Sequence, residues 1–235
     1  MTALMAASPQ AANAQVRPSN EAGGNYTINV MSWWQIPFRS VIHQQYDFSC
    51  GSAAVATLLT YHYNRPTPER IPFTHMWKAG DQQTIRKVGF SMYDMKTYLD
   101  SIGLHTEGYR LGAAGLAKLK RPAIVLLDIK GFKHFVVVKG VRGDRVLVGD
   151  PMLGLNEYSR ADFLKLWNGI ALAVADPKDS KNVKFNLASD WGPWSRAPME
   201  DAGLHVAGDD FLRTLPSSYQ LTPQILLAVN VGTVK

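Results

Sequence analysis

The residue best suited to chemistry is the only cysteine of the chain, Cys50, which stands just before the run 52–63. That run contains no glycine or proline and is rich in alanine and other apolar residues, so it predicts a buried helix beginning beside Cys50. A cysteine attacks as the thiolate, and an ordinary thiol with a pKa of about 8.5 is mostly protonated at neutral pH. The unpaired N–H groups and the dipole at a helix N-terminus stabilise the thiolate. Cys50 is therefore a candidate nucleophile, although a lone cysteine is often only a buried core residue.

Gln44, six positions before Cys50, is the candidate oxyanion donor. Its side-chain amide and the backbone N–H of Cys50 are the kinds of group that stabilise the negative oxygen of a tetrahedral intermediate. Gly51, directly after the cysteine, lets a substrate approach the backbone closely. Gln45 competes for the same role, and a glutamine in a loop is often simply solvated.

His134 is the candidate general base. It precedes the apolar run 135–138, which predicts a strand, so the imidazole is expected to face the core or a cleft. An imidazole in that place can accept the thiol proton and later protonate the leaving amine. The alternative is a core histidine whose ring binds a backbone carbonyl.

Asp150 is the candidate residue for orienting the imidazole. If residues 141–143 form a three-residue loop with Gly143 in the left-handed conformation, the hairpin pairs Asp150 with His134 on one face. A two-residue loop shifts the register by one and turns the carboxylate to the other face. The sequence permits the pair without requiring it, and Asp150-Pro151 is also typical of a turn.

Composition narrows the remaining function classes. The 235 residues carry a net charge of +6, but lysine and arginine are scattered, so no nucleic-acid-binding stripe is indicated. One cysteine excludes an internal disulfide and a cysteine-rich metal site, and the six histidines show no zinc-binding spacing. We therefore expect neither a metal nor an organic cofactor.

The N-terminal residues indicate export. Residues 3–15 are small and weakly apolar, and Ala12-Asn13-Ala14 has the form of a signal-peptidase site. The segment lacks a basic start and a full apolar core, so we interpret it as the remnant of a truncated secretory signal; a disordered leader is the alternative. No later stretch reaches the roughly 18 apolar residues of a transmembrane helix.

The order of the elements predicts an α+β fold in which helices pack against an antiparallel sheet. Three regions are expected: a signal remnant and flexible lead-in at 1–30, a catalytic domain at 31–177, and an extension at 178–235 that wraps the domain or meets a partner. The expected helices are 52–63, 91–102, 115–120 and 159–167, and the expected strands are 123–127, 135–138, 145–148 and 170–175.

Taken together, the motifs resemble those of peptidase family C39, the papain-like endopeptidases that remove leader peptides from bacteriocins. The resemblance rests on Gln44, Cys50-Gly51, His134 with the apolar run after it, and Asp150-Pro151, and it covers roughly residues 38–175. It implies a papain-like cysteine peptidase fold with the nucleophile at a helix N-terminus and Gln44 as oxyanion donor. It also implies an extended polypeptide substrate, cut after Gly-Gly as is usual in the family.

Two departures bear on the context. Ser49 stands where many family members have an acidic residue, and the chain shows neither the transmembrane segments nor the Walker A motif of exporter members. It is more similar to stand-alone, periplasmic C39-like proteins associated with secretion of surface fibres, such as the functional-amyloid (Fap) system. A secreted fibre subunit or secretion-system component is then the expected substrate. Two alternatives stay open: a non-cleaving C39-like module that binds a secretion signal or fibre subunit, and a thiol amidase or transamidase.

Overall fold

The structure is a computed structural model that describes residues 14–16, 28–30, 35–175 and 183–192. The predicted signal segment lies outside the described residues except at its end, where β1 (Ala14–Val16) pairs antiparallel with β2 (Ile28–Val30). Most of the predicted extension 178–235 also lies outside them. None of the helices in the described part combines the length and the apolar character needed to cross a bilayer.

The helix that carries the cysteine runs through the middle of the domain. It begins with α1 (Cys50–Thr57) and continues as one π-helical turn, η2 (Leu58–His62), so the predicted helix is confirmed. All eight residues of α1 are buried. Small side chains on most of its surface let the neighbouring elements approach its backbone from every side.

Three further helices lie on the same side of the sheet as α1. They are α2 (Arg70–Ala79), α3 (Gln82–Val88) and α4 (Met92–Ser101). Helices α2 and α4 pack against α1, and α3 packs against α2. The predicted helix 91–102 is confirmed as α4 and begins with a capping box, since the Ser91 hydroxyl accepts from the backbone of Asp94 and the Asp94 carboxylate accepts from the backbone of Ser91. Helices α2 and α3 were not predicted. A proline in the first turn of a helix removes an N–H that has no helical partner, so Pro72 is compatible with α2.

One six-stranded antiparallel sheet forms the other part of the domain, as predicted. The spatial order is β3-β8-β4-β5-β6-β7. The strands are β3 (Thr106–Arg110), β4 (Ala123–Ile129), β5 (Phe132–Arg142), β6 (Arg145–Asp150), β7 (Gly154–Ser159) and β8 (Trp167–Val174). Strands β3 and β7 were not predicted.

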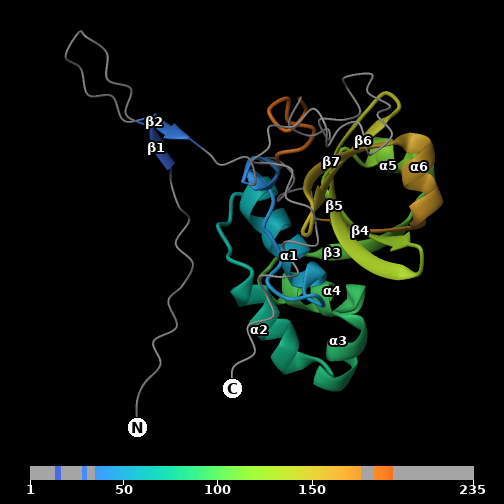
Figure 1. Ribbon diagram of the computed structural model, residues 1–235. Helices are drawn as coiled ribbons and strands as arrows, with labels where there is room; N and C mark the ends of the chain where they lie inside the picture. Colours follow the sequence, from blue (N-terminus) through green and yellow to red (C-terminus); the bar gives the residue numbers. More distant parts are fainter. Residues whose placement is uncertain (1–13, 17–27, 31–34, 176–182, 193–235) are drawn as a thin grey trace. The chain divides into compact units, whose positions relative to one another are not determined.

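Both faces of this sheet are covered, which explains the continuous apolar runs in its strands. Helices α1 to α4 lie on one side, and α5 (Ala113–Leu119) and α6 (Arg160–Leu166) lie on the other (Figure 1). Phe135 and Val137 belong to the core shared with α1, α2 and α4. Val136 and Val138, whose side chains point the opposite way, belong to a second core with Phe163 of α6.

Candidate active site

Cys50 lies at the first position of α1, where the sequence analysis placed it, and its side chain is buried. The loop before it is held by hydrogen bonds to the backbone. The Ser49 hydroxyl donates to the carbonyl of Tyr46 (2.9 Å) and accepts from the N–H of Tyr46 (3.1 Å). The Ser52 hydroxyl donates to the carbonyl of Ser49 (2.8 Å). The thiol is therefore presented by a fixed turn at the helix N-terminus.

His134 and Asp150 form a buried pair. Nε2 of His134 lies 2.8 Å from Oδ1 of Asp150, and the two side chains are 3% and 1% exposed. The same carboxylate oxygen accepts from the backbone N–H groups of Met152 (2.7 Å) and Leu153 (3.1 Å). Asp150 therefore has both of the roles considered from the sequence: its carboxylate stabilises the turn after β6, and it also binds the histidine.

The hairpin between β5 and β6 reaches this pair by a different register from the one predicted. The loop has two residues, 143–144, with Arg142 paired to Arg145, so the expected three-residue loop and the direct pairing of His134 with Asp150 are wrong. Gly143 does have a positive φ of 55°. By itself, this shorter loop would turn Asp150 to the face opposite His134.

A β-bulge in β5 returns Asp150 to the face of the sheet on which His134 lies. Between the pairs Gly140↔Leu147 and Val138↔Val148 the register shifts by one, which leaves Lys139 as the extra residue. The next pair is Val137↔Gly149, and continuing the register by one residue sets Asp150 opposite Val136. Val136 and His134 point to the same face, so the carboxylate reaches the imidazole diagonally.

The electrostatic environment favours the imidazolium form of His134. Burial by itself lowers the pKa of His134, but the hydrogen bond to Asp150 and the nearby Cys50 side chain outweigh burial and raise it to about 9. Within the described part of the chain, Nδ1 of His134 has no conventional hydrogen-bond partner. Since Nε2 is occupied by Asp150, Nδ1 is the ring nitrogen free to exchange a proton with the sulfur.

Gln44 connects the cysteine loop to the turn that carries Asp150. Its backbone N–H donates to the carbonyl of Pro151 (3.0 Å), and its side-chain Nε2 donates to the carbonyl of Tyr46 (3.0 Å). The Gln44 side chain is buried, whereas Gln45 is exposed. The structure thus brings all four predicted residues into one region, with Gln44 better enclosed than its competitor.

Glu69, a buried carboxylate that contacts the cysteine loop, was not predicted. One oxygen accepts from the backbone N–H of Gln45 (2.9 Å), and the other lies 3.1 Å from the hydroxyl of Ser52, whose single proton is shared between this carboxylate and the carbonyl of Ser49. Burial raises the pKa of Glu69, and hydrogen bonds from Ser49, Ser52 and Gln45 oppose that effect. No local sequence pattern predicts that Glu69 supports the cysteine loop, because it reaches the loop from the start of α2.

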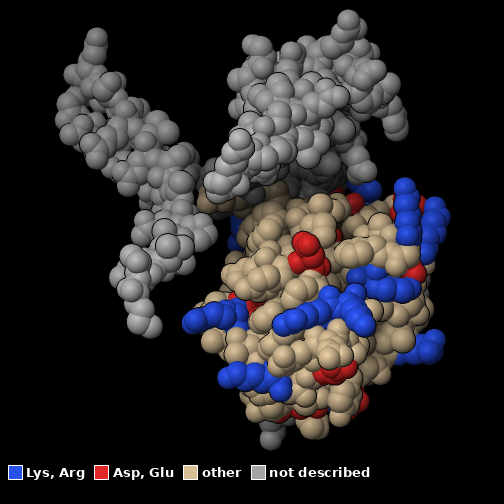
Figure 2. All heavy atoms as spheres, turned by 60° about the horizontal axis from the view of Figure 1, so that its bottom comes forward, with Lys and Arg blue, Asp and Glu red and all other residues tan. Residues whose placement is uncertain are grey.

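A cleft of about 460 Å³ opens beside Cys50, and a cavity of about 540 Å³ adjoins it. Val88, Gly89 and Lys133 line both spaces, so the two lie next to each other. Arg86 and Lys87 also line the cleft, and Lys and Arg side chains are spread over the face that Figure 2 brings forward. Within the described ranges, no three His, Cys, Asp or Glu side chains lie close enough together to hold a metal ion.

Comparison with known proteins identifies the family. The profile of the peptidase C39 family matches residues 39–179. The chain belongs to the peptidase C39 family. It is 45% identical over 157 residues to a probable functional amyloid protease, FapD, of Pseudomonas aeruginosa, covering 67% of this chain and 70% of the relative. The probable FapD of Pseudomonas fluorescens is 46% identical over 137 residues, 58% of this chain and 61% of the relative.

A solved structure agrees on the fold. The peptidase domain of Streptococcus ComA, a bi-functional ABC transporter involved in quorum sensing, superposes with a TM-score of 0.50 at 20% identity. The match covers 58% of this chain and 97% of that domain. The chain is thus a cysteine peptidase with a papain-like α+β fold, and the predicted family and fold class are confirmed.

Proposed function

We propose that the chain is a thiol endopeptidase whose triad is Cys50, His134 and Asp150, with Gln44 as oxyanion donor. The observation that carries this proposal is the buried 2.8 Å contact between His134 and Asp150. The imidazole is enclosed, one of its nitrogens binds a carboxylate, and the Cys50 thiol lies near the ring. Thiol acyl transfer requires this arrangement. A histidine that served only to fill the core could be satisfied by a backbone carbonyl, whereas the carboxylate of Asp150 also favours the charged imidazolium form.

In the proposed reaction the Cys50 thiolate adds to a peptide carbonyl carbon, and the negative charge moves to the carbonyl oxygen. The Cys50 backbone N–H and the Gln44 amide stabilise that oxygen. The Gln44 amide has two N–H bonds, and one of them already donates to Tyr46, so the second serves the oxyanion. The C–N bond then breaks as the imidazolium of His134 protonates the leaving amine.

Deacylation uses the same groups in reverse. His134 takes a proton from water, the resulting hydroxide attacks the thioester, and the C–S bond breaks to release the new carboxyl terminus and the Cys50 sulfur. Asp150 holds the ring throughout and favours its charged form. No step needs a metal or an organic cofactor.

For the substrate we propose an exported polypeptide that lies extended along the cleft beside Cys50. The relatives named as functional amyloid proteases favour a fibre subunit or another component of its secretion system, and hence a periplasmic site of action. Arg86, Lys87 and Lys133 line the cleft against a single carboxylate, Asp47. Lys133 is paired with Asp128, so Arg86 and Lys87 supply the excess of positive charge, which favours a substrate with acidic residues near the cleavage point.

The test is to co-express the chain, or its Cys50→Ala variant, with a candidate fibre-system polypeptide and to measure the secreted product by mass spectrometry. We expect a defined truncated product with the wild type and the intact polypeptide with Cys50→Ala. The same melting temperature for both proteins would show that the fold is retained. Equal processing by Cys50→Ala would overturn the proposal, and normal export without any cleavage would favour the non-cleaving binding module.

A further inference from the structure

The described part of the C-terminal segment, residues 183–192, packs on the strand that carries His134. It lies beyond the residues matched by the family profile, 39–179. The backbone N–H of Lys184 donates to the carbonyl of His62 (3.1 Å), and the backbone N–H of Asn186 donates to the carbonyl of Lys139 (2.8 Å). The segment therefore binds the very residue that forms the β-bulge.

The packing around the bulge leaves no spare room. A Cβ atom on Gly140 would lie 2.6 Å from Oδ1 of Asn186 and 3.1 Å from the ring of Trp191. On the neighbouring strand, a Cβ atom on Gly149 would lie 2.9 Å from Cδ of Lys139. The Lys139 stem thus fills the space over Gly149, the residue before Asp150.

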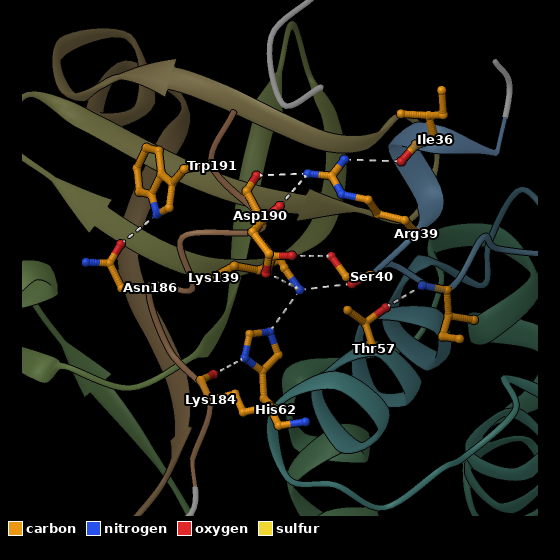
Figure 3. A network of polar contacts seen from close by, with 12 residues as sticks. Ile36, Arg39, Ser40, Thr57, His62, Lys139, Lys184, Asn186, Asp190 and Trp191 are labelled. Atoms are coloured by element: carbon orange, nitrogen blue, oxygen red, sulfur yellow. Dashed lines mark hydrogen bonds and ion pairs between the residues drawn. The ribbon is translucent and has the colours of Figure 1, made fainter. Parts of the chain in front are cut away.

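The Lys139 side chain ends in a buried polar network (Figure 3). Its ammonium donates to the carbonyl of Ser40 (2.9 Å), lies 3.2 Å from Nε2 of His62, and forms an ion pair with Asp190 (3.3 Å). Asp190 also accepts from the hydroxyl of Ser40 (2.8 Å), and Arg39 donates to the Asp190 carbonyl (3.3 Å). All the polar contacts of the Lys139 ammonium come from outside the β5–β6 hairpin.

Asp190 is the only acidic side chain among the described residues that forms an ion pair with Lys139. Burial lowers the pKa of Lys139 to about 8, with Asp190 opposing that effect, and burial lowers the pKa of His62 to about 3. His62 is therefore neutral at pH 7, which leaves the lysine charge to be balanced by Asp190. A buried ammonium without its carboxylate is strongly destabilised, so losing Asp190 favours withdrawal of Lys139 from this site.

We propose that Asp190 and Lys139 are positioning residues for the active site: their ion pair holds the β-bulge that places Asp150 on the face of His134. This inference rests on the proposed Cys50, His134 and Asp150 triad. Without the bulge, the two-residue loop would put Asp150 on the wrong face. The segment around Asp190 is thereby part of the catalytic domain. Asp190 follows Lys139 by about 50 residues, so a distant part of the chain positions the active site.

The test uses the full chain with Asp190→Asn, Asp190→Ala and, as a matched control, Asp162→Asn, which removes an exposed ion pair with Lys165 (2.7 Å). The main readout is the pH titration of the His134 ring followed by NMR, assigned with a His134→Gln variant. In the wild type the ring should titrate near pH 9. In the folded Asp190 variants we expect its pKa to fall by about one unit or more, because the carboxylate of Asp150 is displaced. The control should titrate like the wild type.

A second readout is peptidase kinetics. A catalytic group that is misplaced by about 1 Å lowers the reaction rate by about 100-fold. We therefore expect kcat/KM to fall by about that factor in Asp190→Ala, mainly through kcat. If the Asp190 variants do not fold, the double variant Lys139→Met with Asp190→Leu keeps the side-chain volume without the buried charges. The pKa of His134 in this double variant then tests the inference in their place. An unchanged His134 pKa in a folded variant without the ion pair would overturn the inference. A wild-type ring that titrates near 6.5 would instead contradict the proposed triad.

Discussion

Replacing Asp150 by asparagine removes the charge that favours the imidazolium of His134 while keeping the shape of the side chain. The amide oxygen can still accept from Met152, Leu153 and the histidine ring, so the turn after β6 should survive. Only the electrostatic contribution of the carboxylate is then lost. The consequence should be a defect in activity whose size depends on pH.

The magnitude follows from the pKa of about 9 for His134 against the ordinary value of 6.5. If the variant returns to 6.5, the protonated fraction at pH 8 falls from about 90% to about 3%, a loss of ~30-fold in the reactive form. At pH 6 both proteins are mostly protonated, and the same calculation gives a loss of only ~1.3-fold. Any loss of orientation multiplies both values by the same factor.

The assay is kcat/KM for one peptide substrate measured between pH 6 and pH 9.5 with wild type, Asp150→Asn and the control Asp162→Asn. We expect the wild-type profile to fall above about pH 9, because His134 then loses its proton. The ratio of wild type to Asp150→Asn should grow by about 20-fold from pH 6 to pH 8. A ratio that stays constant over this range would refute the view that Asp150 acts through the pKa of His134.

Three further predictions concern the surroundings of the site. Gln44→Ala should lower kcat by about 100- to 1000-fold with little change in KM, whereas Gln45→Ala should have almost no effect; equal effects in a kinetic assay would exclude the Gln44 assignment. Glu69→Ala should reduce the free energy of unfolding in urea by about 1–2 kcal/mol, because it removes the carboxylate that accepts from the N–H of Gln45 and contacts the hydroxyl of Ser52; wild-type stability would contradict this role. Gly154→Ala places a Cβ atom 2.5 Å from a neighbouring proline at a φ of 83°, so it should cost about 3 kcal/mol or more in the same measurement. Gly131→Ala, at a φ of 91° but facing open space, should cost only about 1–2 kcal/mol.

Much of the fold could be predicted from local patterns. The run after Cys50 specifies a buried helix because it contains no glycine or proline and is rich in alanine and other apolar residues. Ser91 with Asp94 specifies a helix start because the capping box is a local interaction. The apolar runs in β4, β5 and β6 specify strands covered on both faces. By contrast, β3 and β7 were not predicted. β3 is stabilised by pairing with β8, which is far along the chain. β7 pairs with the adjacent β6, but its polar residues Asn156 and Glu157 interrupt the apolar pattern.

The identity of the chemical groups was likewise available from the sequence: a thiol at a helix start, an imidazole on a strand, a carboxylate after the next strand and an amide before the thiol. Their geometry was not. The register that brings Asp150 to His134 depends on a bulge at Lys139, and the bulge depends on Asn186 and Asp190, which follow it by about 50 residues. Hydrophobic periodicity cannot reveal such a dependence, because a bulge is stabilised by contacts that form only when the chain has folded. The sequence by itself thus determined which groups could react, and the tertiary structure decided on which face of the sheet they meet.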